Sequence, residues 1–387
     1  MVDFSLTDEQ KDLREMAHNF AEKEMRTVAW EYDKEGTWPI DVINKAWEVG
    51  LMNTHLESEY GGAGLDYLSG CLIEEELAWG CSGIGTSIGA NGLASAPVQL
   101  GGSEETKKKY LGMLAEEPKL ASFCLTEPDA GSDVAGMKTR AVKKGDKYVL
   151  NGSKCFITNA SFASQFTVFC KVGKPSSQLM GCVIVPADSM SKNDPVLFQN
   201  ENFELGALNG GRITIGKPED KLGQRLSNTA SVTFEDVVID DGQIIGDRRL
   251  GFKYLVDVLD YARPMVAAIG VGLARRALDV TLEYTKQRKQ FGQRICDLPV
   301  ARETLVAMWK KVEVADLALM KAAVRVQEKA EDRGMYSSLA KNVAAEAAIF
   351  CANEGLHLHG GYGFMSEYEI SKLARDAHII DIYEGVR

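Results

Sequence analysis

Apolar positions recur with a helical period at both ends of the chain and with a strand-like period between them. The first helical stripe comprises Leu13, Met16, Ala17, Phe20 and Ala21. Thr7 and Gln10 precede it at the spacing of a capping box, in which each side chain accepts a hydrogen bond from the other residue's backbone amide. Further stripes cover 42–51 and 67–79, and another follows Glu104. The first 120 or so residues are therefore predicted to be mostly helical.

After Thr126 the pattern changes to short runs of β-branched and aromatic residues, separated by Gly, Pro, Asn or Asp. The runs are 148–150, 155–158, 166–172, 182–185, 212–215 and 231–234. The first two flank Asn151-Gly152, a dipeptide typical of a two-residue hairpin turn because both residues tolerate positive φ. We therefore expect a β domain here, with a hairpin turn at Asn151-Gly152.

From Gly251 onward the helical period returns, over 256–287, 301–332 and 335–358, and Gly360-Gly361 is expected to end the last helix. Long helices with short connections predict a bundle. The order helix, strand, helix disfavours alternating βαβ units, and hence a Rossmann or TIM architecture. The expected domains are 1–123, 124–243 and 244–387.

Composition narrows the class of protein. A chain of 387 residues, 45% hydrophobic and 26% charged, is ordinary for a globular protein of two or three domains. A net charge of -11 offers no basic field for phosphates, so no nucleic acid partner is expected. No apolar run is long enough to predict a membrane span, and the first ten residues resemble neither a signal nor a transit peptide. The eight cysteines form no CxxC pair and are expected to be buried thiols.

Three short motifs resemble known functional patterns, but the sequence around each motif disfavours that function. Residues 85–89 match the GxSxG of a serine hydrolase, but a nucleophile elbow needs a preceding strand, and this stretch is helical. GRITIGK at 211–217 resembles a phosphate-binding loop but lacks its final hydroxyl and is expected to be a strand. His357 and His359 are two residues apart, so they diverge on a helix, and no metal site is predicted.

Three other motifs together resemble the acyl-CoA dehydrogenase family, and its medium-chain members most closely. They are LTEPDAGSDVAG at 125–136, RKQFG at 288–292 and RDAHIIDIYEG at 375–385. The resemblance implies an α+β, mostly α fold: an N-terminal helical domain, a central antiparallel β-barrel-like domain and a C-terminal four-helix bundle. It also implies an FAD-dependent oxidation of a fatty acyl-CoA to a trans-2-enoyl-CoA in β-oxidation. Electrons would pass to an electron-transferring flavoprotein. The protein would be a homotetramer in the mitochondrial matrix, without its presequence here, or in a bacterial cytoplasm.

The catalytic base implied by the resemblance is Glu384. Some family members carry a glutamate at the position of Ala262, and alanine cannot remove a proton, so the base must come from the other family position. A carboxylate that removes an α-proton needs a pKa raised by desolvation, and Ile382 and Tyr383 are expected to keep water away. The Glu384 backbone N–H would polarise the thioester oxygen. The resemblance further implies substrate contacts from Ser132, Asp260, Arg263, Tyr383 and Gly385, and places Gly89 and Ala90 near the floor of the acyl pocket.

The FAD contacts implied by the resemblance come from four stretches of the chain, partly across a subunit interface. They are Phe123, Leu125, Thr126, Gly131, Ser132, Phe156, Ile157, Thr158, Arg288, Gln290, Phe291, His357, Gly360 and Gly361. Glycines let a flavin approach the backbone, and Phe156 offers a stacking surface where medium-chain members usually have Trp.

Several positions depart from the family pattern where it contacts FAD. Leu298-Pro299 replaces a pair ending in Gln, His357 replaces a Gln, and Val386 stands where Thr is expected. The chain then ends at Arg387, so the C-terminal bundle is expected to be truncated. These departures leave a second hypothesis open: a noncatalytic scaffold or assembly protein with an impaired FAD site.

Overall fold

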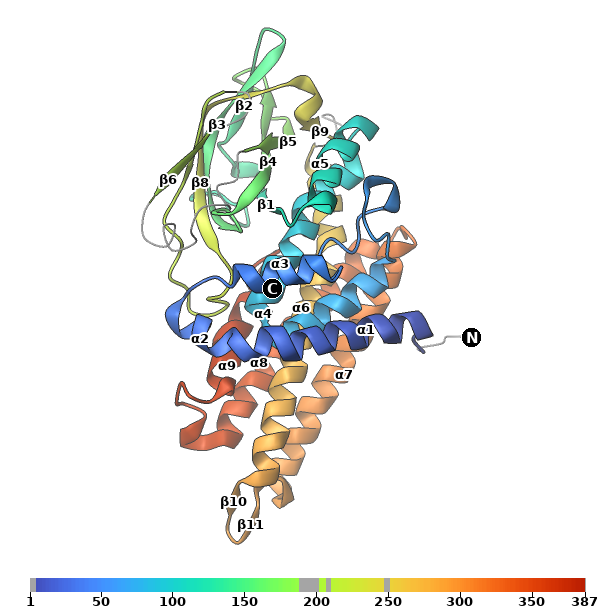
Figure 1. Cartoon of the computed structure of the whole chain (residues 1–387), viewed down its shortest axis with the longest axis vertical. Coiled ribbons are helices and arrows are strands. Elements are labelled where there is room, and N and C mark those ends of the chain that lie inside the picture. Colours follow the sequence, from blue (N-terminus) through green and yellow to red (C-terminus); the bar gives the residue numbers. More distant parts are fainter. Residues whose placement is uncertain (1–4, 188–201, 207–209, 247–250, 387) are drawn as a thin grey trace.

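The computed structural model describes residues 5–187, 202–206, 210–246 and 251–386, and it consists of a helical body with a β-sheet domain at one end (Figure 1). The helices are α1 (Asp8–Phe20), α2 (Arg26–Glu35), α3 (Ile40–Glu48), α4 (Tyr67–Gly101), α5 (Glu104–Glu116), α6 (Gly251–Gln287), α7 (Pro299–Gln327), α8 (Arg333–His359) and α9 (Glu369–Ile380). The strands are β1 (Leu120–Cys124), β2 (Arg140–Lys144), β3 (Lys147–Thr158), β4 (Ala163–Gly173), β5 (Met180–Pro186), β6 (Phe203–Gly206), β7 (Arg212–Ile215), β8 (Thr229–Ile239), β9 (Ile244–Ile245), β10 (Lys289–Gln290) and β11 (Gln293–Arg294).

The predicted helix starts are confirmed by their caps. Thr7 Oγ1 accepts the Gln10 amide at 3.2 Å and Gln10 Oε1 accepts the Thr7 amide at 3.1 Å, which completes the capping box of α1. Asp66 caps α4 by accepting the Ser69 amide at 2.7 Å. Residues 85–89 lie inside α4, so the helical context that disfavours a nucleophile elbow is confirmed.

Helix α4 is bent in the middle, and this bend positions residues used below. Cys81 has φ -165° and ψ 112°, values outside the helical region, so α4 consists of two helical halves. The N-terminal half packs into the bundle of α6, α7, α8 and α9, where Tyr67 and Cys71 join the largest apolar cluster. Helices from both ends of the sequence therefore share one core.

The central domain is a single nine-stranded sheet, in the order β6-β7-β8-β3-β2-β4-β5-β9 with β1 beside β4. All predicted strand runs lie in strands, including GRITIGK at β7. Most neighbours are antiparallel as predicted, but β4 pairs in parallel with β1 and with β2. Apolar side chains from the sheet, such as Phe166, Val168, Val232 and Phe234, form a separate core.

The predicted hairpin turn at Asn151-Gly152 is wrong. Both residues lie inside β3, where the register against β8 shifts between Leu150 and Gly152. Asn151 lies opposite two residues of β8, Glu235 and Asp236, so β8 carries the extra residue of a bulge. The Asn151 side chain bonds Asp236 in both directions, accepting the Asp236 amide at 2.9 Å and donating to Oδ1 at 3.2 Å. Gly152 is needed because an added Cβ would lie 2.4 Å from Thr139 Oγ1.

The turn of the hairpin formed by β2 and β3 lies earlier in the chain than predicted. Lys144 pairs with Lys147 across β2 and β3, so Gly145 and Asp146 connect the strands. Gly145 has φ 66°, as a tight turn with positive φ requires. The turn was therefore predicted at Gly152, whereas it lies at Gly145.

Two further structural observations bear on function. No helix in the described ranges is long and apolar enough to span a bilayer. Within those same residues, no three His, Cys, Asp or Glu side chains gather as a metal site would require. Six of the eight cysteines are buried, whereas Cys155 and Cys296 are partly exposed, which departs from the expectation that all are buried.

Candidate active site

Glu384 lies in the tight turn that follows α9. The turn begins with the Tyr383 amide donating to the Ile379 carbonyl at 3.1 Å, beyond the last helical residue. Glu384 has φ 55° and Gly385 has φ 109°, so the backbone enters the left-handed region at both residues. A residue other than glycine pays a conformational cost in that region, and such residues are concentrated at functional sites.

The Glu384 carboxyl group points into the protein although the turn itself is partly exposed. Its Oε2 atom is shielded from solvent and has no hydrogen-bond partner among the described residues. Burial raises the pKa of Glu384 to about 7, and the positive charges of Arg263 and Lys341 offset part of this rise. A desolvated carboxyl group that titrates near neutral pH is suited to removing a proton.

Arg263 connects α6 to this turn. Its Nε donates to the Glu384 carbonyl at 3.2 Å, and its Nη1 donates to Asp260 Oδ1 at 3.0 Å and to Ser338 Oγ at 3.1 Å. Asp260 is held close to α8, since a Cβ at Gly334 would lie 2.4 Å from its carboxylate. The structure thus brings together Asp260, Arg263, Tyr383, Glu384 and Gly385.

Lys341 also holds the turn, and the sequence analysis missed it. Its buried Nζ donates to the Asp381 carbonyl at 3.2 Å and to the Gly385 carbonyl at 2.5 Å. The available signal was a lysine between Ala340 and Ala344 on a buried face of α8, because a fully buried lysine is rare unless it is paired.

Tyr383 packs beside Glu384 and near two polar side chains, those of Thr86 and Gln224. Burial raises the pKa of the Tyr383 phenol, and the nearby side chains of Gln224 and Thr86 offset part of that rise, although the hydroxyl makes no hydrogen bond of acceptable geometry in the described structure. Gln224 has φ 45°, and its amide donates to Asp376 Oδ1 at 2.5 Å. Ile382 is 55% exposed, so the expectation that it helps keep the site dry is wrong.

The loop after β1 carries the first group of predicted cofactor residues, and β3 holds it in place. The Cys155 amide donates to the Thr126 carbonyl at 3.0 Å. The buried Lys154 donates to the Leu125 carbonyl and to Glu127 Oε1, both at 2.8 Å. These bonds place Leu125 and Thr126 beside the segment that carries Phe156.

Phe156 presents its ring to solvent from a strained position. It has φ 59° and is 66% exposed, at a register shift between Lys154 and Ile157. Thr158 is half-buried and its carbonyl accepts the Ser122 hydroxyl, whereas the Ile157 side chain lies in the sheet core and offers no surface to a ligand. An exposed ring beside a loop is a surface on which a planar group can stack.

The remaining residues of this group differ in exposure. Phe123 is half-buried and packs against Phe169 with ring centroids 5.5 Å apart. Gly131 and Ser132 are exposed, and a Cβ added at Gly131 would meet no atom within 4 Å. The loop therefore leaves open space beside its backbone, as close approach of a ligand requires.

The second group of predicted cofactor residues lies at the end of the bundle that is remote from the sheet (Figure 1). A pocket of about 460 Å³ there is lined by Tyr284, Arg288, Gln290, Ile295, His357, Leu358, His359, Gly360, Gly361, Tyr362 and Met365. This volume lies in the range of small-molecule sites. Phe291 projects nearby from the turn between β10 and β11, 89% exposed. Figure 1 shows this turn at the end of the molecule remote from the sheet.

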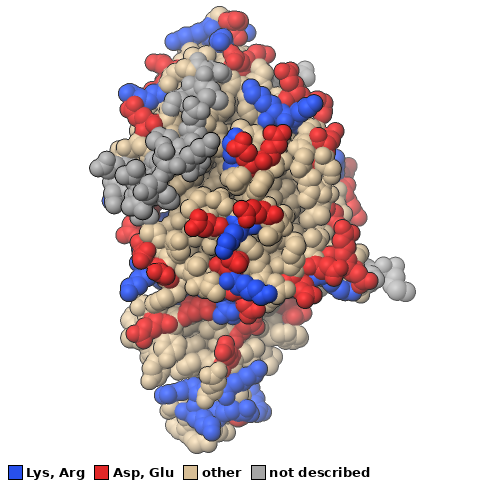
Figure 2. Space-filling model, in the orientation of Figure 1, with Lys and Arg blue, Asp and Glu red and all other residues tan. Residues whose placement is uncertain are grey.

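The bundle end is basic although the chain as a whole is acidic. Figure 2 shows Lys and Arg side chains gathered there, whereas acidic and basic groups alternate elsewhere on this face. The exposed basic residues near the turn are Lys286, Arg288, Lys289, Arg294 and Arg302. Arg288 lies over the Tyr362 ring at 5.2 Å. This combination favours a ligand with an aromatic part and an anionic part.

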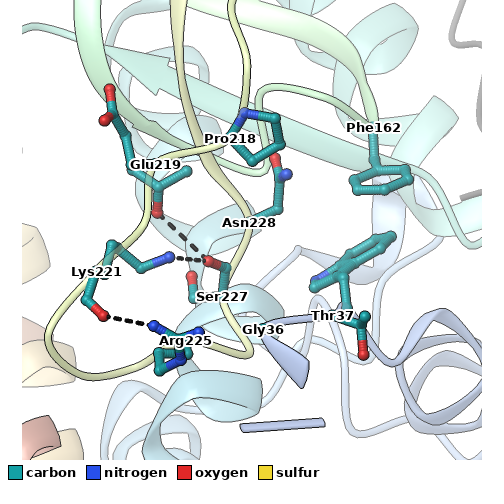
Figure 3. A pocket seen from close by; sticks show the side chains of 11 residues that line it. Gly36, Thr37, Phe162, Pro218, Glu219, Lys221, Arg225, Ser227 and Asn228 are labelled. Atoms are coloured by element: carbon teal, nitrogen blue, oxygen red, sulfur yellow. Dashed lines mark hydrogen bonds between the residues drawn. The ribbon is translucent and has the colours of Figure 1, made fainter. Parts of the chain in front are cut away.

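A second cavity, near the loop before β8, is much smaller (Figure 3). It measures about 40 Å³, enough for a water molecule but not for a cofactor. The stacked rings of Trp38 and Phe162 close one side. On the other side Lys221 Nζ donates to the Ser227 carbonyl at 2.6 Å, and desolvation lowers the pKa of this lysine to about 8. The lysine is therefore used to hold the loop.

Family models match the chain in three consecutive stretches. They are the N-terminal domain of acyl-CoA dehydrogenase at 7–118, its middle domain at 122–237 and its C-terminal domain at 249–387. The chain belongs to the acyl-CoA dehydrogenase family. The resemblance seen in the motifs is thereby confirmed, and the mostly helical fold with a central sheet is the fold of this family.

Individual acyl-CoA dehydrogenases are similar over nearly the whole chain. A probable medium-chain specific acyl-CoA dehydrogenase 2, mitochondrial, of Caenorhabditis briggsae is 38% identical over 99% of this chain and 89% of its own. The solved butyryl-CoA dehydrogenase of Megasphaera elsdenii is 34% identical with a TM-score of 0.89, over 100% of this chain and 96% of its own. An acyl-CoA dehydrogenase of Bacillus anthracis, solved in complex with FAD, is 30% identical with a TM-score of 0.86, over 100% and 67%.

The departures from the pattern of the acyl-CoA dehydrogenases do not fill the two candidate cofactor regions. Leu298 and Pro299 form the N-cap and first turn of α7, where proline is favoured because its missing amide needs no partner. His357 is exposed and lines the bundle-end pocket rather than closing it. Val386 is 64% exposed, and Arg387 lies outside the described residues.

Proposed function

We propose that this protein oxidises a fatty acyl-CoA to a trans-2-enoyl-CoA, with FAD as cofactor and Glu384 as the base. The observation that carries the proposal is the Glu384 carboxyl group, which is buried, has no hydrogen-bond partner at Oε2 in the described structure, and titrates near pH 7. Membership of the acyl-CoA dehydrogenase family supports the reaction class.

Each residue of the turn has a role in this proposal. Glu384 removes the α-proton of the thioester, and its backbone N–H donates to the thioester oxygen as charge develops there. Arg263 and Lys341 hold the turn through backbone carbonyls, so the carboxyl group is kept in one position. Bound FAD, held by the predicted cofactor residues, would supply the acceptor for the hydride of the β-carbon.

The cofactor residues separate into a flavin group and a bundle-end group, and we propose that one FAD uses both by binding between two chains. The flavin group, Thr126 and Phe156 with their neighbours, offers an exposed ring and an open backbone. The bundle-end group, Arg288, Gln290, His357, Gly360 and Gly361, offers a basic pocket. The flavin group belongs to the sheet domain, and the bundle-end group lies around the β10–β11 turn, at the end of the molecule remote from the sheet (Figure 1), so one ligand that contacts both must bridge two copies.

A homotetramer is the assembly we propose. Apolar side chains remain exposed along α7, where Val306 is 61%, Trp309 55%, Val314 50% and Leu317 47% exposed. Apolar surface of this kind is typical of a subunit interface.

We further propose the domain limits 123/124 and 243/244, an electron-transferring flavoprotein as electron acceptor, a role in β-oxidation, and a mitochondrial matrix or bacterial cytoplasmic location.

Glu384→Gln tests the base. The amide keeps the shape of the side chain but cannot accept the proton, so FAD and acyl-CoA should still bind while turnover is lost. Binding is followed by the flavin absorbance shift and turnover by bleaching of the flavin with octanoyl-CoA. Glu367→Gln, an exposed glutamate before α9, is the matched control. Unchanged turnover in Glu384→Gln would refute the assignment.

The scaffold hypothesis is tested on the same preparation. A flavin absorbance band that is retained through purification, or restored by added FAD, supports the enzyme. Colourless protein that takes up no FAD would support a noncatalytic role instead, and the departures at Leu298, Pro299, His357 and Val386 would then be the first positions to revert.

A further inference from the structure

Glu74, on the N-terminal half of α4, is a buried carboxyl group that the proposed reaction does not use. It is 6% exposed, and its Oε1 atom has no hydrogen-bond partner among the described residues. Its neighbours on the helix are paired with arginines: Glu75 Oε1 accepts from Arg14 at 3.2 Å and Glu76 accepts from Arg275 at 2.8 Å, although Glu75 Oε2 has no partner within the described residues. An unpaired buried carboxyl group destabilises the fold, so its presence calls for a reason outside packing.

The bend in α4 directs the second half of the helix against Glu74. A Cβ added at Gly89 would lie 2.7 Å from Glu74 Oε2, and one at Gly85 would lie 3.4 Å from Oε1. Any larger residue at position 89 would therefore displace the carboxyl group. The two glycines leave the space that this carboxyl group occupies, so its position is defined by both halves of α4.

The Glu74 face of α4 is directed toward the Tyr383–Glu384 turn. Ala78 lies four residues after Glu74, on the same helix face, and packs in a small apolar cluster with Ile380. Tyr383 packs against the same cluster. The charges of Glu74 and Glu384 both raise the pKa of Tyr383, so this phenol lies within electrostatic reach of both carboxyl groups.

A second incompletely paired group, the Gln224 amide nitrogen, approaches Tyr383 from the loop before β8. Thr86, one residue after Gly85, donates to Gln224 Oε1 at 3.2 Å. The Gln224 Nε2 atom is buried and reaches no hydrogen-bond partner of acceptable geometry within the described ranges. Gln224 is also held in a strained backbone conformation by Asp376. An acceptor at Glu74 and a donor at Gln224 are thus both available near Tyr383.

We propose that Glu74 and Gln224 form a subsite for an uncharged hydroxyl group carried on the acyl chain, away from the thioester. This inference rests on the proposed function and specifies its substrate class. A hydroxyl group can donate to Glu74 Oε1 and accept from Gln224 Nε2, which satisfies both groups. A carboxylate on the substrate would meet a second carboxyl group in a desolvated site, and a plain methyl end would leave both protein groups unpaired.

The test compares acyl-CoAs of equal length with and without a terminal hydroxyl group, using FAD-loaded protein. The pairs are hexanoyl-CoA with 6-hydroxyhexanoyl-CoA, octanoyl-CoA with 8-hydroxyoctanoyl-CoA, and decanoyl-CoA with 10-hydroxydecanoyl-CoA. We expect kcat/KM to favour the hydroxylated member by about tenfold or more at one length, because a site with unpaired polar groups rejects the analogue that lacks the hydroxyl. Equal kcat/KM within every pair overturns the subsite.

Variants distinguish the subsite from a general change in structure. Glu74→Met should reduce the preference to near unity, and Gln224→Met should reduce it independently from the other side. Glu74→Gln retains an acceptor and should keep part of the preference. Glu116→Met, an exposed glutamate at the end of α5, should leave the preference unchanged. A preference that survives both Met substitutions overturns the assignment.

The outcome also separates this inference from the proposed function. If no acyl-CoA of any kind bleaches the flavin, the dehydrogenase proposal fails and the subsite fails with it. If unsubstituted acyl-CoAs are oxidised as readily as their hydroxylated partners, only the subsite is wrong.

Discussion

Lys341 Nζ donates to the Gly385 carbonyl at 2.5 Å, from a buried position on α8. We expect Lys341→Met to lower kcat by about 10- to 100-fold, because the turn that carries Glu384 would lose an anchor and misplaced reacting groups cost roughly 100-fold. The ammonium group also holds the Glu384 pKa down. Its loss should therefore move the acid limb of the pH–rate profile to higher pH.

Profiles of kcat against pH measure both effects of Lys341→Met in one experiment. The control is Lys310→Met, an exposed lysine on α7, which should leave rate and profile unchanged. A reduced rate with an unshifted limb would show that Lys341 acts on the turn but not on the Glu384 charge.

The wild-type protein should lose activity on the acid side of neutrality. Burial raises the pKa of Glu384 to about 7, and only the ionised carboxylate can accept the α-proton. Thus kcat/KM should rise about tenfold per pH unit up to roughly pH 7 and then level. Stopped-flow bleaching of the flavin between pH 5 and 9 measures the limb. A limb centred near the ordinary value for glutamate would contradict a desolvated base.

Breaking the buried pair between Lys154 and Glu127 should be costly. The pair lies at 2.8 Å with side chains 0% and 5% exposed, so Lys154→Met leaves the Glu127 carboxylate buried without its cationic partner, with only the backbone amides of Lys138 and Thr139 as donors. We expect a loss of roughly 3–5 kcal/mol in the free energy of unfolding, together with weaker FAD binding because the loop from Leu125 is released. Chemical denaturation and flavin retention measure the two effects.

Lys138→Met is the matched control for Lys154→Met. Lys138 pairs with Asp129 at 2.7 Å, but the side chains are 75% and 72% exposed. A surface pair of this kind contributes at most about 1 kcal/mol. Similar losses in both variants would mean that burial does not decide the strength of these pairs.

Glu74 should make stability depend on pH. Burial raises the Glu74 pKa to about 8, from an ordinary value of 4.5. Between these pH values the unfolded chain ionises while the folded chain does not, so rising pH favours unfolding by up to about 1.4 kcal/mol per pH unit. The advantage of Glu74→Gln over the wild type in free energy of unfolding should therefore grow from pH 5 to pH 8. A constant difference across this range would contradict a buried, protonated Glu74.

Much of the fold follows from local patterns, and the failures have local causes. Helix starts at Thr7 and the strand at Arg212–Ile215 were predictable because caps and β-branched runs act within a few residues. The turn was wrongly predicted at Asn151-Gly152 because this dipeptide is typical of turns, whereas here it lies opposite a bulge in β8, and the close contact with Thr139 that requires the glycine is not visible in the pattern. The parallel pairing of β4 with β1 and β2 was not predicted, because it depends on how these strands are arranged in the sheet and not on their local sequence.

The site was predictable only where a motif marks it. Arg263 and Glu384 lie 121 positions apart, and the resemblance to a family placed both. Lys341 and Glu74 belong to no motif used here, and their importance comes from burial among apolar residues, which periodicity alone does not measure. The exposure of Ile382 was missed for the same reason.

The distance between the flavin group and the bundle-end group has a genetic consequence. Two chains, one damaged at Phe156 and the other at Arg288, would each be inactive alone. Mixed at equal amounts and allowed to exchange subunits, they would regain about a quarter of the intact sites, since half of the random pairs are mixed and each mixed pair contains one undamaged site of two. Recessive lesions at the two ends of this protein would thus complement one another, whereas two lesions at the same end would not.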